Sequence, residues 1–249
     1  MGLLDNWYQG RTLVFGHRGA SAYAPMNTLP AFELAADQGA DGIELDVWLS
    51  ADRHLVVIHD ATVDHTTGGS GCVYHKTLAD LKALDASHRL EPYKGARIPT
   101  LDEVFQAVGQ RLYINVEVKA DRNMLPGTEQ AVADSIRSFG LESRVIVSSF
   151  SSEILKTFRA IAPEVPIGFL YSEETRSNDW ELIQTVPHEA RHPRQTMIDA
   201  SVMVDIKRDG YRVNTWTVND PARAAELRSL GVDAIITDKP DVILQALRG

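Results

Sequence analysis

Short, β-rich apolar segments alternate with amphipathic helical segments along almost the whole of this chain. The alternation is typical of parallel strands joined by crossover helices. It predicts strands near residues 12–16, 42–47, 112–118, 144–148, 166–170, 187–191, 211–217 and 233–237. It predicts helices near residues 28–38, 100–109, 128–139, 151–162, 179–186, 196–209, 220–230 and 241–248. Eight such pairs in 249 residues predict an α/β fold, a TIM (β/α)8 barrel that spans residues 1–249 as one domain.

Local signals mark several of these boundaries. Asn27 or Thr28 is placed to cap the first helix, and Gly39 follows its last turn. Asp220 precedes the helix near 220–230, and Gly231 comes after it. The strand near 187–191 has the least support, because the sequence HEARHPRQ holds few β-branched or aromatic residues.

Residues 54–97 interrupt the alternation. A predicted strand, HLVVIH, is followed by a glycine-rich turn and a short helix near residues 77–85. We interpret residues 60–97 as a small insertion after the second barrel strand. Loops that follow barrel strands line the catalytic face, so we expect this insertion to cover the site and to influence substrate choice.

Charge and cysteine content limit the partners of the chain. A formal net charge of −9 gives no overall attraction for polyanions, so nucleic acid is not an expected partner. Cys72 is the single cysteine, which excludes an intrachain disulfide and a structural zinc site built on paired thiols. The first residues contain no apolar run long enough for a secretion signal or a membrane span. We therefore expect a cytoplasmic protein without stable membrane insertion, and the sequence leaves its oligomeric state open.

Paired acidic residues occur on two of the predicted barrel strands. Glu44 and Asp46 share one face of the strand in GIELDVWL, because alternate strand residues point the same way. Glu117 and Lys119 repeat this spacing in NVEVKA. Carboxylates of an isolated pair commonly lie in solvent, but three from neighbouring strands also form the oxygen-rich site that Mg²⁺ or Ca²⁺ prefers. Lys119 adds a positive charge suited to an anionic substrate.

Two histidines and an arginine follow predicted strands. His17 and Arg18 come directly after TLVFG, and His59 comes after LVVI. Imidazoles exchange protons near neutral pH, so two of them across a scissile bond form a general acid and base. The guanidinium group of Arg18 can donate two parallel hydrogen bonds to a phosphate. A structural, hydrogen-bonding role is the alternative for each histidine taken singly.

A series of segments gives a more specific identification. GHRGASAYAP, NTLPAF, GIELDVWLSADRHLVVIHD, TTGGSG, IPTLDEVF, NVEVKA, VIVSSF, NTWTVND and GVDAIITDKP occur in this order over residues 13–248. In the order and content of these segments, the chain resembles the glycerophosphodiester phosphodiesterase family. The resemblance implies a TIM-barrel enzyme, a phosphoric diester hydrolase of lipid and glycerol metabolism. Its substrates would be small glycerophosphodiesters, cleaved to glycerol 3-phosphate and an alcohol.

The resemblance also implies a role for each candidate residue. His17 and His59 become the general acid–base pair, and Arg18 and Lys119 hold the phosphate. Glu44, Asp46 and Glu117 become the ligands of one divalent cation, Mg²⁺ or Ca²⁺, with Mn²⁺ as a further option. Trp216 becomes an aromatic wall for the substrate, with a core position as the alternative. Asn27 and Asp60 become supporting or helix-capping residues, and attack by water or by a glycerol hydroxyl group stays open.

This chain departs from the family pattern at Met26. The family usually carries glutamate there, before Asn27, so an acid near Arg18 is replaced by an apolar thioether. We expect altered affinity and retained chemistry, because both histidines and all three carboxylates are present. His65 likewise stands where the family often has arginine, which leaves the preferred head group open. The alternatives are a phospholipase D-type enzyme that acts on lysophospholipids and a non-catalytic barrel that binds phosphodiesters.

Overall fold

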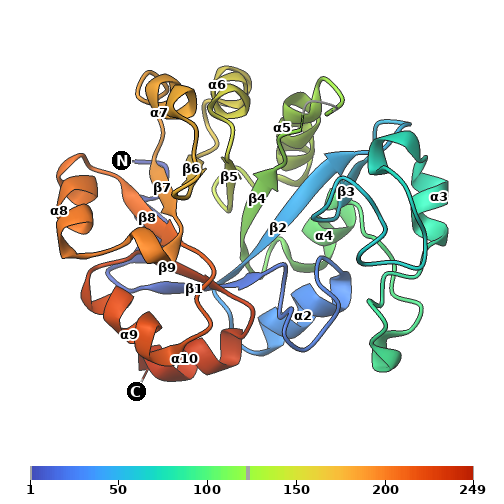
Figure 1. The fold of residues 1–249 in the computed structure, drawn as a ribbon, viewed down its shortest axis with the longest axis horizontal. Coiled ribbons are helices and arrows are strands. Elements are labelled where there is room, and N and C mark those ends of the chain that lie inside the picture. The colour runs from blue at the N-terminus through green and yellow to red at the C-terminus, as the bar shows by residue number, and fades with distance from the viewer. Residues whose placement is uncertain (1, 122–123, 249) are drawn as a thin grey trace.

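A computed structural model of the chain describes residues 2–121 and 124–248. In these residues eight parallel strands form a closed barrel with helices around it, which confirms the predicted TIM barrel (Figure 1). Strand β1 pairs with both β2 and β9 and so closes the ring, while the short β3 pairs antiparallel with the end of β2. The strands are β1 (Leu13–His17), β2 (Gly42–Leu49), β3 (Leu55–Val57), β4 (Tyr113–Val118), β5 (Val145–Ser149), β6 (Ile167–Tyr171), β7 (Ala190–Pro193), β8 (Arg212–Thr215) and β9 (Ala234–Thr237).

Amphipathic helices cover the outside of the barrel (Figure 1). Their apolar faces pack on outward-facing strand residues, such as Ile43, Leu45 and Val47 of β2, in one large hydrophobic cluster and in a second cluster beneath the last three helices. The helices are α1 (Asp5–Tyr8), α2 (Leu29–Asp37), α3 (Leu78–Ala83), α4 (Leu101–Val108), α5 (Thr128–Phe139), α6 (Ser152–Ile161), α7 (Ser177–Ile183), α8 (Ala200–Arg208), α9 (Pro221–Ser229) and α10 (Pro240–Arg248). Short 3₁₀ turns lie at Val73–His75, Glu91–Tyr93 and Gln195–Met197.

Three boundary predictions need correction. The poorly supported strand near 187–191 lies instead at Ala190–Pro193, where pairing with β6 and β8 fixes it despite weak strand propensity. The helix expected near 196–209 begins at residue 200, because the Asp199 side chain accepts a hydrogen bond from the Val202 amide and a 3₁₀ turn precedes it. The Thr28 side chain does not cap α2 as expected. Its hydroxyl group donates to the Pro25 carbonyl oxygen.

Helix α1, which the sequence did not predict, closes the amino-terminal end of the barrel. Trp7 and Tyr8 are both buried there, and the Trp7 ring stacks on Tyr113 with a centroid distance of 4.3 Å. The Trp7 indole nitrogen donates to the Ser143 carbonyl oxygen at 2.9 Å. Four residues are too short for a stable isolated helix, so tertiary packing holds α1 in place.

The segment between β3 and α4 has a hydrophobic cluster of its own. It carries helix α3, close to the short helix that the sequence predicted near 77–85, and also the 3₁₀ turn Val73–His75, and it lies beside β3 at one side of the barrel (Figure 1). Its buried residues pack on Trp48 and Val56 and are Ile58, Val63, Val73, Leu81, Ala86 and Ile98. This packing fixes the start of the segment, where His59 lies. Among the described residues, no helix is both long and apolar enough to cross a membrane.

Acidic residues that directly precede strands join neighbouring strands at the amino-terminal end. Asp233, just before β9, accepts a 2.6 Å hydrogen bond from the Val213 amide of β8 and pairs with Lys207 and Arg212. Asp41 accepts from the amide of Val14 in the same way, before β2. These buried carboxylates add side-chain bonds to the strand ladder at the end opposite His17.

Replacing Asp233 with alanine tests this contribution. The change leaves a buried amide and a lysine without their acceptor, so we expect the free energy of unfolding to fall by about 3 kcal/mol. Chemical denaturation measures this change in the free energy of unfolding. Asp205→Ala, which removes an exposed helical ion pair with Arg208, should change it by less than about 0.5 kcal/mol. Equal effects of the two substitutions would contradict the stabilising role assigned to Asp233.

Candidate active site

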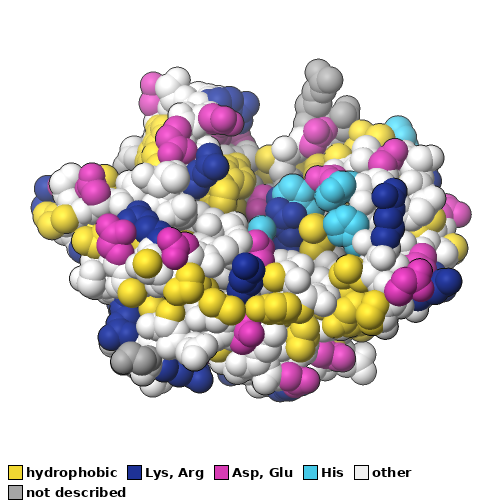
Figure 2. Space-filling model, turned by 60° about the horizontal axis from the view of Figure 1, so that its bottom comes forward, with side chains coloured by type: hydrophobic (Ala, Val, Ile, Leu, Met, Phe, Trp, Pro, Cys, Tyr) yellow, Lys and Arg dark blue, Asp and Glu magenta, His cyan; other side chains and the backbone are white. Residues whose placement is uncertain are grey.

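A cavity of about 180 Å³ opens at the carboxyl ends of the barrel strands. On this face histidine, basic and acidic side chains gather in a cleft beside hydrophobic ones (Figure 2). The cavity is lined by His17, Arg18, Glu44, His59, Asn115, Glu117, Lys119, Phe150, Leu170, Trp216, Thr217 and Ile236. Seven of the eight site residues predicted from the sequence line it, and Asp46, the eighth, lies buried directly against them.

Three carboxylates converge at the edge of this cavity. Glu44 and Asp46 project from β2 and Glu117 from β4, with Asp46 and Glu117 in register. All three residues are buried, and one oxygen atom from each lies within 4.8 Å of the others. That spacing allows all three oxygens to contact one cation at the 2.0–2.6 Å distances typical of Mg²⁺ and Ca²⁺.

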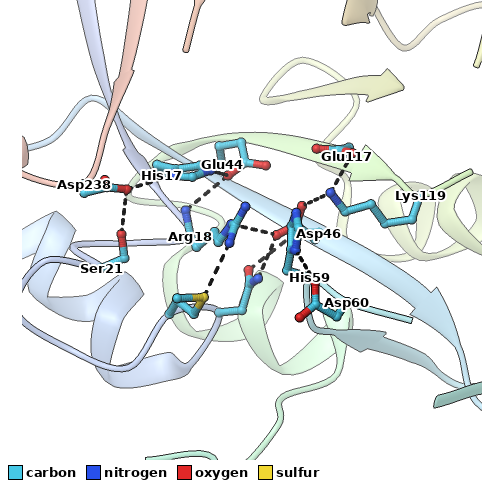
Figure 3. A network of polar contacts seen from close by, with 12 residues as sticks. His17, Arg18, Ser21, Glu44, Asp46, His59, Asp60, Glu117, Lys119 and Asp238 are labelled. Carbon is cyan, nitrogen blue, oxygen red and sulfur yellow. Dashed lines mark hydrogen bonds and ion pairs between the residues drawn. The ribbon is translucent and has the colours of Figure 1, made fainter. Parts of the chain in front are cut away.

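Two basic side chains contact the carboxylates (Figure 3). Lys119 Nζ lies 2.7 Å from Asp46 Oδ1 and 2.7 Å from Glu117 Oε1. Arg18 Nε lies 3.4 Å from Asp46 Oδ2. The Arg18 backbone has a positive φ of 56°, and its amide donates to the Glu44 carbonyl oxygen at 2.8 Å. This tight turn after β1 directs the guanidinium group across β2.

The pKa values of the three acids differ because their charged neighbours act with or against burial. Burial raises the pKa of Glu44 well above its usual value, and the charges of Asp46 and Glu117 raise it further. Burial also raises the pKa of Glu117. For Asp46, burial acts in the same direction, but Lys119 and Arg18 outweigh it and lower the pKa. Asp46 is therefore the firmly ionised member, whereas Glu44 resists ionisation unless further positive charge is present.

His17, at the end of β1, is held by an aspartate from β9's carboxyl end. Its Nδ1 lies 2.7 Å from Asp238 Oδ1. Ser21 and Asn219 also donate to Asp238. Burial opposes ionisation of Asp238, but the hydrogen bonds from His17 and Asn219 outweigh burial and lower its pKa to about 2. The ionised Asp238 fixes the imidazole ring, and Nε2 of His17 then faces Glu44 at 3.9 Å from Oε2.

His59 has an equivalent anchor. Its Nδ1 lies 2.7 Å from Asp60 Oδ1, and its carbonyl oxygen accepts a hydrogen bond from the Trp48 indole at 3.1 Å. Burial, and then the charge of Lys119, lower the pKa of His59. In Figure 3 His17 lies beside Glu44 and His59 lies beside Asp46, each with Nδ1 bound to a carboxylate.

The loop after β1 supplies two further contacts. Asn27 Nδ2 donates to Asp46 Oδ2 at 2.7 Å, so this side chain orients a carboxylate and does not cap α2. The Arg18 Nη1 atom contacts the Met26 sulfur at 3.4 Å. A thioether is a weak acceptor, so Asp46 is the stronger partner of this guanidinium group.

Trp216 is half-buried and lines the cavity, so its place agrees with either position that the sequence left open. Its indole nitrogen donates to the His192 carbonyl oxygen at 2.9 Å, which ties it to β7, and its ring lines the cavity. The Phe150 ring meets it edge to face with a centroid distance of 5.5 Å. The sequence analysis did not select Asp238, Asn115 or Phe150. For Asn115 a signal was present, because it alternates with Glu117 and Lys119 in NVEVKA.

A family model, the glycerophosphoryl diester phosphodiesterase family, matches residues 17–242. This span contains every site residue described above. The chain belongs to the glycerophosphoryl diester phosphodiesterase family. It is therefore an enzyme of the phosphoric diester hydrolase class.

Relatives of this family match the chain over nearly its full length. A glycerophosphodiester phosphodiesterase of Caldanaerobacter subterraneus subsp. tengcongensis is 40% identical over 96% of this chain and 98% of its own length. A Bacillus altitudinis glycerophosphodiester phosphodiesterase is 38% identical over 92% of this chain and 96% of its own. An Oleispira antarctica phosphodiesterase, solved with the product sn-glycerol-3-phosphate, superimposes with a TM-score of 0.89 at 33% identity, covering 97% of this chain and 99% of that one.

The raised pKa of Glu44 predicts a pH-dependent effect of Glu44→Gln on the chelated protein. Because the folded-state pKa lies above the unfolded value, wild-type stability falls as the pH rises from the unfolded pKa through the folded one. Glutamine cannot ionise, so the variant avoids this loss. We expect it to gain stability relative to wild type between pH 5 and pH 8, by about 1.4 kcal/mol for each unit of pKa elevation.

Denaturant titrations at both pH values, in the presence of chelator, measure this difference. Glu33→Gln, on an exposed position of α2, is the matched control and should show no such trend. A Glu44→Gln effect that is the same at pH 5 and pH 8 would contradict the raised pKa.

Proposed function

We propose that this enzyme hydrolyses glycerophosphodiesters to glycerol 3-phosphate and an alcohol, with one divalent cation and a pair of histidines. The observation that carries the proposal is the carboxylate triad, with oxygens within 4.8 Å of one another, beside a cavity lined by two histidines that are anchored through Nδ1. The Oleispira antarctica relative, solved with sn-glycerol-3-phosphate, supports the identity of the product.

The charge balance of the site supports a divalent cation. Three carboxylates face two basic side chains, Arg18 and Lys119, which leaves one excess negative charge when all are ionised. A divalent cation changes that excess to a single positive charge, which matches the single negative charge of a phosphodiester. Glu44, Asp46 and Glu117 would hold it. Their hard oxygen ligands favour Mg²⁺ or Ca²⁺, with Mn²⁺ as an alternative. When bound, such a cation stabilises charge that develops on the phosphoryl group.

Arg18 and Lys119 are placed to orient the phosphate. Both side chains line the cavity, and both are largely buried against Asp46. Burial by itself lowers the pKa of Lys119, but the neighbouring Asp46 and Glu117 raise it above its usual value, so its ammonium group stays charged. In this desolvated setting, ammonium and guanidinium groups stabilise an anionic transition state more than they would in water.

The histidine anchors define the proton transfers. A hydrogen bond from Nδ1 to Asp238 or Asp60 leaves Nε2 of each ring to exchange protons with the substrate. The lowered pKa of His59 keeps it neutral near pH 7, which suits it to accept the proton of the attacking hydroxyl group, whether from water or glycerol. His17 then donates a proton to the departing alcohol.

The cavity dimensions favour a small, water-soluble substrate. A volume of about 180 Å³ encloses a glycerol phosphate group more readily than an acyl chain. A larger, shallow groove of about 530 Å³ adjoins it at Phe150 and Trp216, and we assign the leaving alcohol to that side. A cytoplasmic location remains a prediction from the sequence, supported by its single cysteine.

Substrate and metal are tested together. We expect turnover of glycerophosphocholine and glycerophosphoglycerol with release of glycerol 3-phosphate, complete loss of turnover after chelation, and recovery with Mg²⁺, Ca²⁺ or Mn²⁺. Calorimetry should give one bound ion per chain, with affinity at least about tenfold lower in Glu117→Gln and unchanged in the exposed control Glu226→Gln. Activity confined to lysolipid micelles would identify a phospholipase D-type enzyme, and the absence of metal-restored turnover would indicate a binding protein.

The Asp238 anchor gives a second test of the catalytic pair. His17→Ala should lower kcat by about 10²–10⁴-fold, and Asp238→Asn by about 10–100-fold, because the amide no longer stabilises the protonated imidazole. The double variant should lose no more than His17→Ala alone, since Asp238 acts through His17. Asp241→Asn, whose carboxylate accepts only a surface hydrogen bond from Tyr23, is the control. If the losses of kcat from the two single substitutions add up in the double variant, Asp238 does not act through His17.

A further inference from the structure

Asn115 is a buried polar residue whose side chain has no hydrogen-bond partner among the described residues. It is 2% exposed, and both its Nδ2 and its Oδ1 are unpaired. Burial without partners opposes folding, because a donor and an acceptor both give up their hydrogen bonds to water. In native proteins such groups are uncommon and call for a specific explanation.

The position of Asn115 in the barrel places it against the substrate. On β4 it shares the inward face with Glu117, two residues further along the strand. It is in register with Glu44 on β2, which is itself in register with His17 on β1. Asn115 lines the same cavity as these three side chains. Its amide thus lies one step deeper in the barrel than Glu117, at the level of His17.

The lining of the cavity combines charged, apolar and uncharged polar groups. Arg18, Lys119 and the carboxylates carry charges that suit a phosphate and a cation. Apolar side chains of the lining are Phe150, Leu170, Trp216 and Ile236, and Asn115, in register with Glu44, supplies an uncharged amide. An amide offers one donor group and one acceptor, which is the complement of a hydroxyl group. Phosphate oxygens only accept and would leave Oδ1 unpaired.

We propose that Asn115 binds a hydroxyl group of the glycerol moiety and so selects glycerophosphodiesters over phosphodiesters that lack hydroxyl groups. The proposal rests on the proposed function and adds a specificity residue to it. The apolar side chains of the same cavity would contact the carbon atoms of glycerol, while Arg18 and Lys119 hold the phosphate. Asn115 takes no part in proton transfer.

Asn115→Leu tests the proposal, because leucine has a similar volume and no hydrogen-bonding group. We expect kcat/KM for glycerophosphocholine to fall by about 10–100-fold, as two hydrogen bonds are lost, and kcat/KM for bis(p-nitrophenyl) phosphate to stay within about threefold. The Tm should be unchanged or higher, since an unpaired buried amide is removed. Calorimetric affinity for Mg²⁺ or Ca²⁺ should equal that of the wild type.

Ser148→Ala is the matched control. Ser148 is fully buried with an unpaired Oγ, and it lies outside the set of described residues that line the cavity. The Ser148→Ala substitution should change kcat/KM for glycerophosphocholine and for bis(p-nitrophenyl) phosphate by the same factor. Equal losses on both substrates in Asn115→Leu, a lowered metal affinity or a lowered Tm would overturn the proposal in favour of a metal-site or structural role.

Product binding separates this proposal from the proposed function. By calorimetry, Asn115→Leu should bind sn-glycerol 3-phosphate about 10–100-fold more weakly than wild type does, and ethyl phosphate, which has no hydroxyl group, equally well. Equal weakening for both would overturn the assignment of Asn115. Failure of the wild type to turn over any glycerophosphodiester would instead overturn the proposed function, while a selective loss of glycerol 3-phosphate binding would still support the role of Asn115.

Discussion

The burial of five charged side chains at the mouth of the barrel is the constraint on which the site depends. Asp46 is the centre of this cluster, because Lys119, Arg18 and Asn27 all contact its carboxylate. Removing such charges from water is costly, so each must be held against a partner by a rigid scaffold. The in-register pairing of β2 with β4 provides that scaffold and keeps Asp46 beside Glu117. The excess of acid over base in this cluster supports the proposed divalent cation.

Closure of the barrel joins this cluster to the two histidines. His17 ends β1, whose pairing with β2 sets it beside Glu44 and whose pairing with β9 brings Asp238 to its Nδ1. His59 reaches the same cavity by another route, through the short antiparallel β3 and the hydrophobic cluster beneath the segment that follows. Each imidazole is therefore oriented by a carboxylate from a loop, while its place is fixed by strand pairing. Loop residues thus orient the two imidazole rings, and the paired strands fix the positions of the three carboxylates.

The cavity combines charged, aromatic and uncharged polar groups. Arg18, Lys119 and the carboxylates carry its charges, Trp216 and Phe150 are aromatic, and Asn115, in register with Glu44, supplies an amide. Met26 contacts Arg18 through its sulfur, while Asp46 keeps the guanidinium group paired. Among the described residues the buried Asn115 amide has no hydrogen-bond partner, a local conflict with stability of the kind expected at functional sites.

The sequence by itself determined the barrel, its order of elements and the polar strand ends, because these follow from local periodicity and from residue types within single segments. Glu44, Asp46, Glu117 and Lys119 were predictable for this reason, since alternation along a strand fixes which side chains share a face. Only the tertiary structure decided the contacts between segments. Asp238 lies 221 positions from His17, and its role follows from ring closure, which no local pattern encodes. Asn27 contacts Asp46 instead of capping a helix, and Asn115 has no hydrogen-bond partner in the described part of the chain, because strand register and burial decide which polar atoms meet.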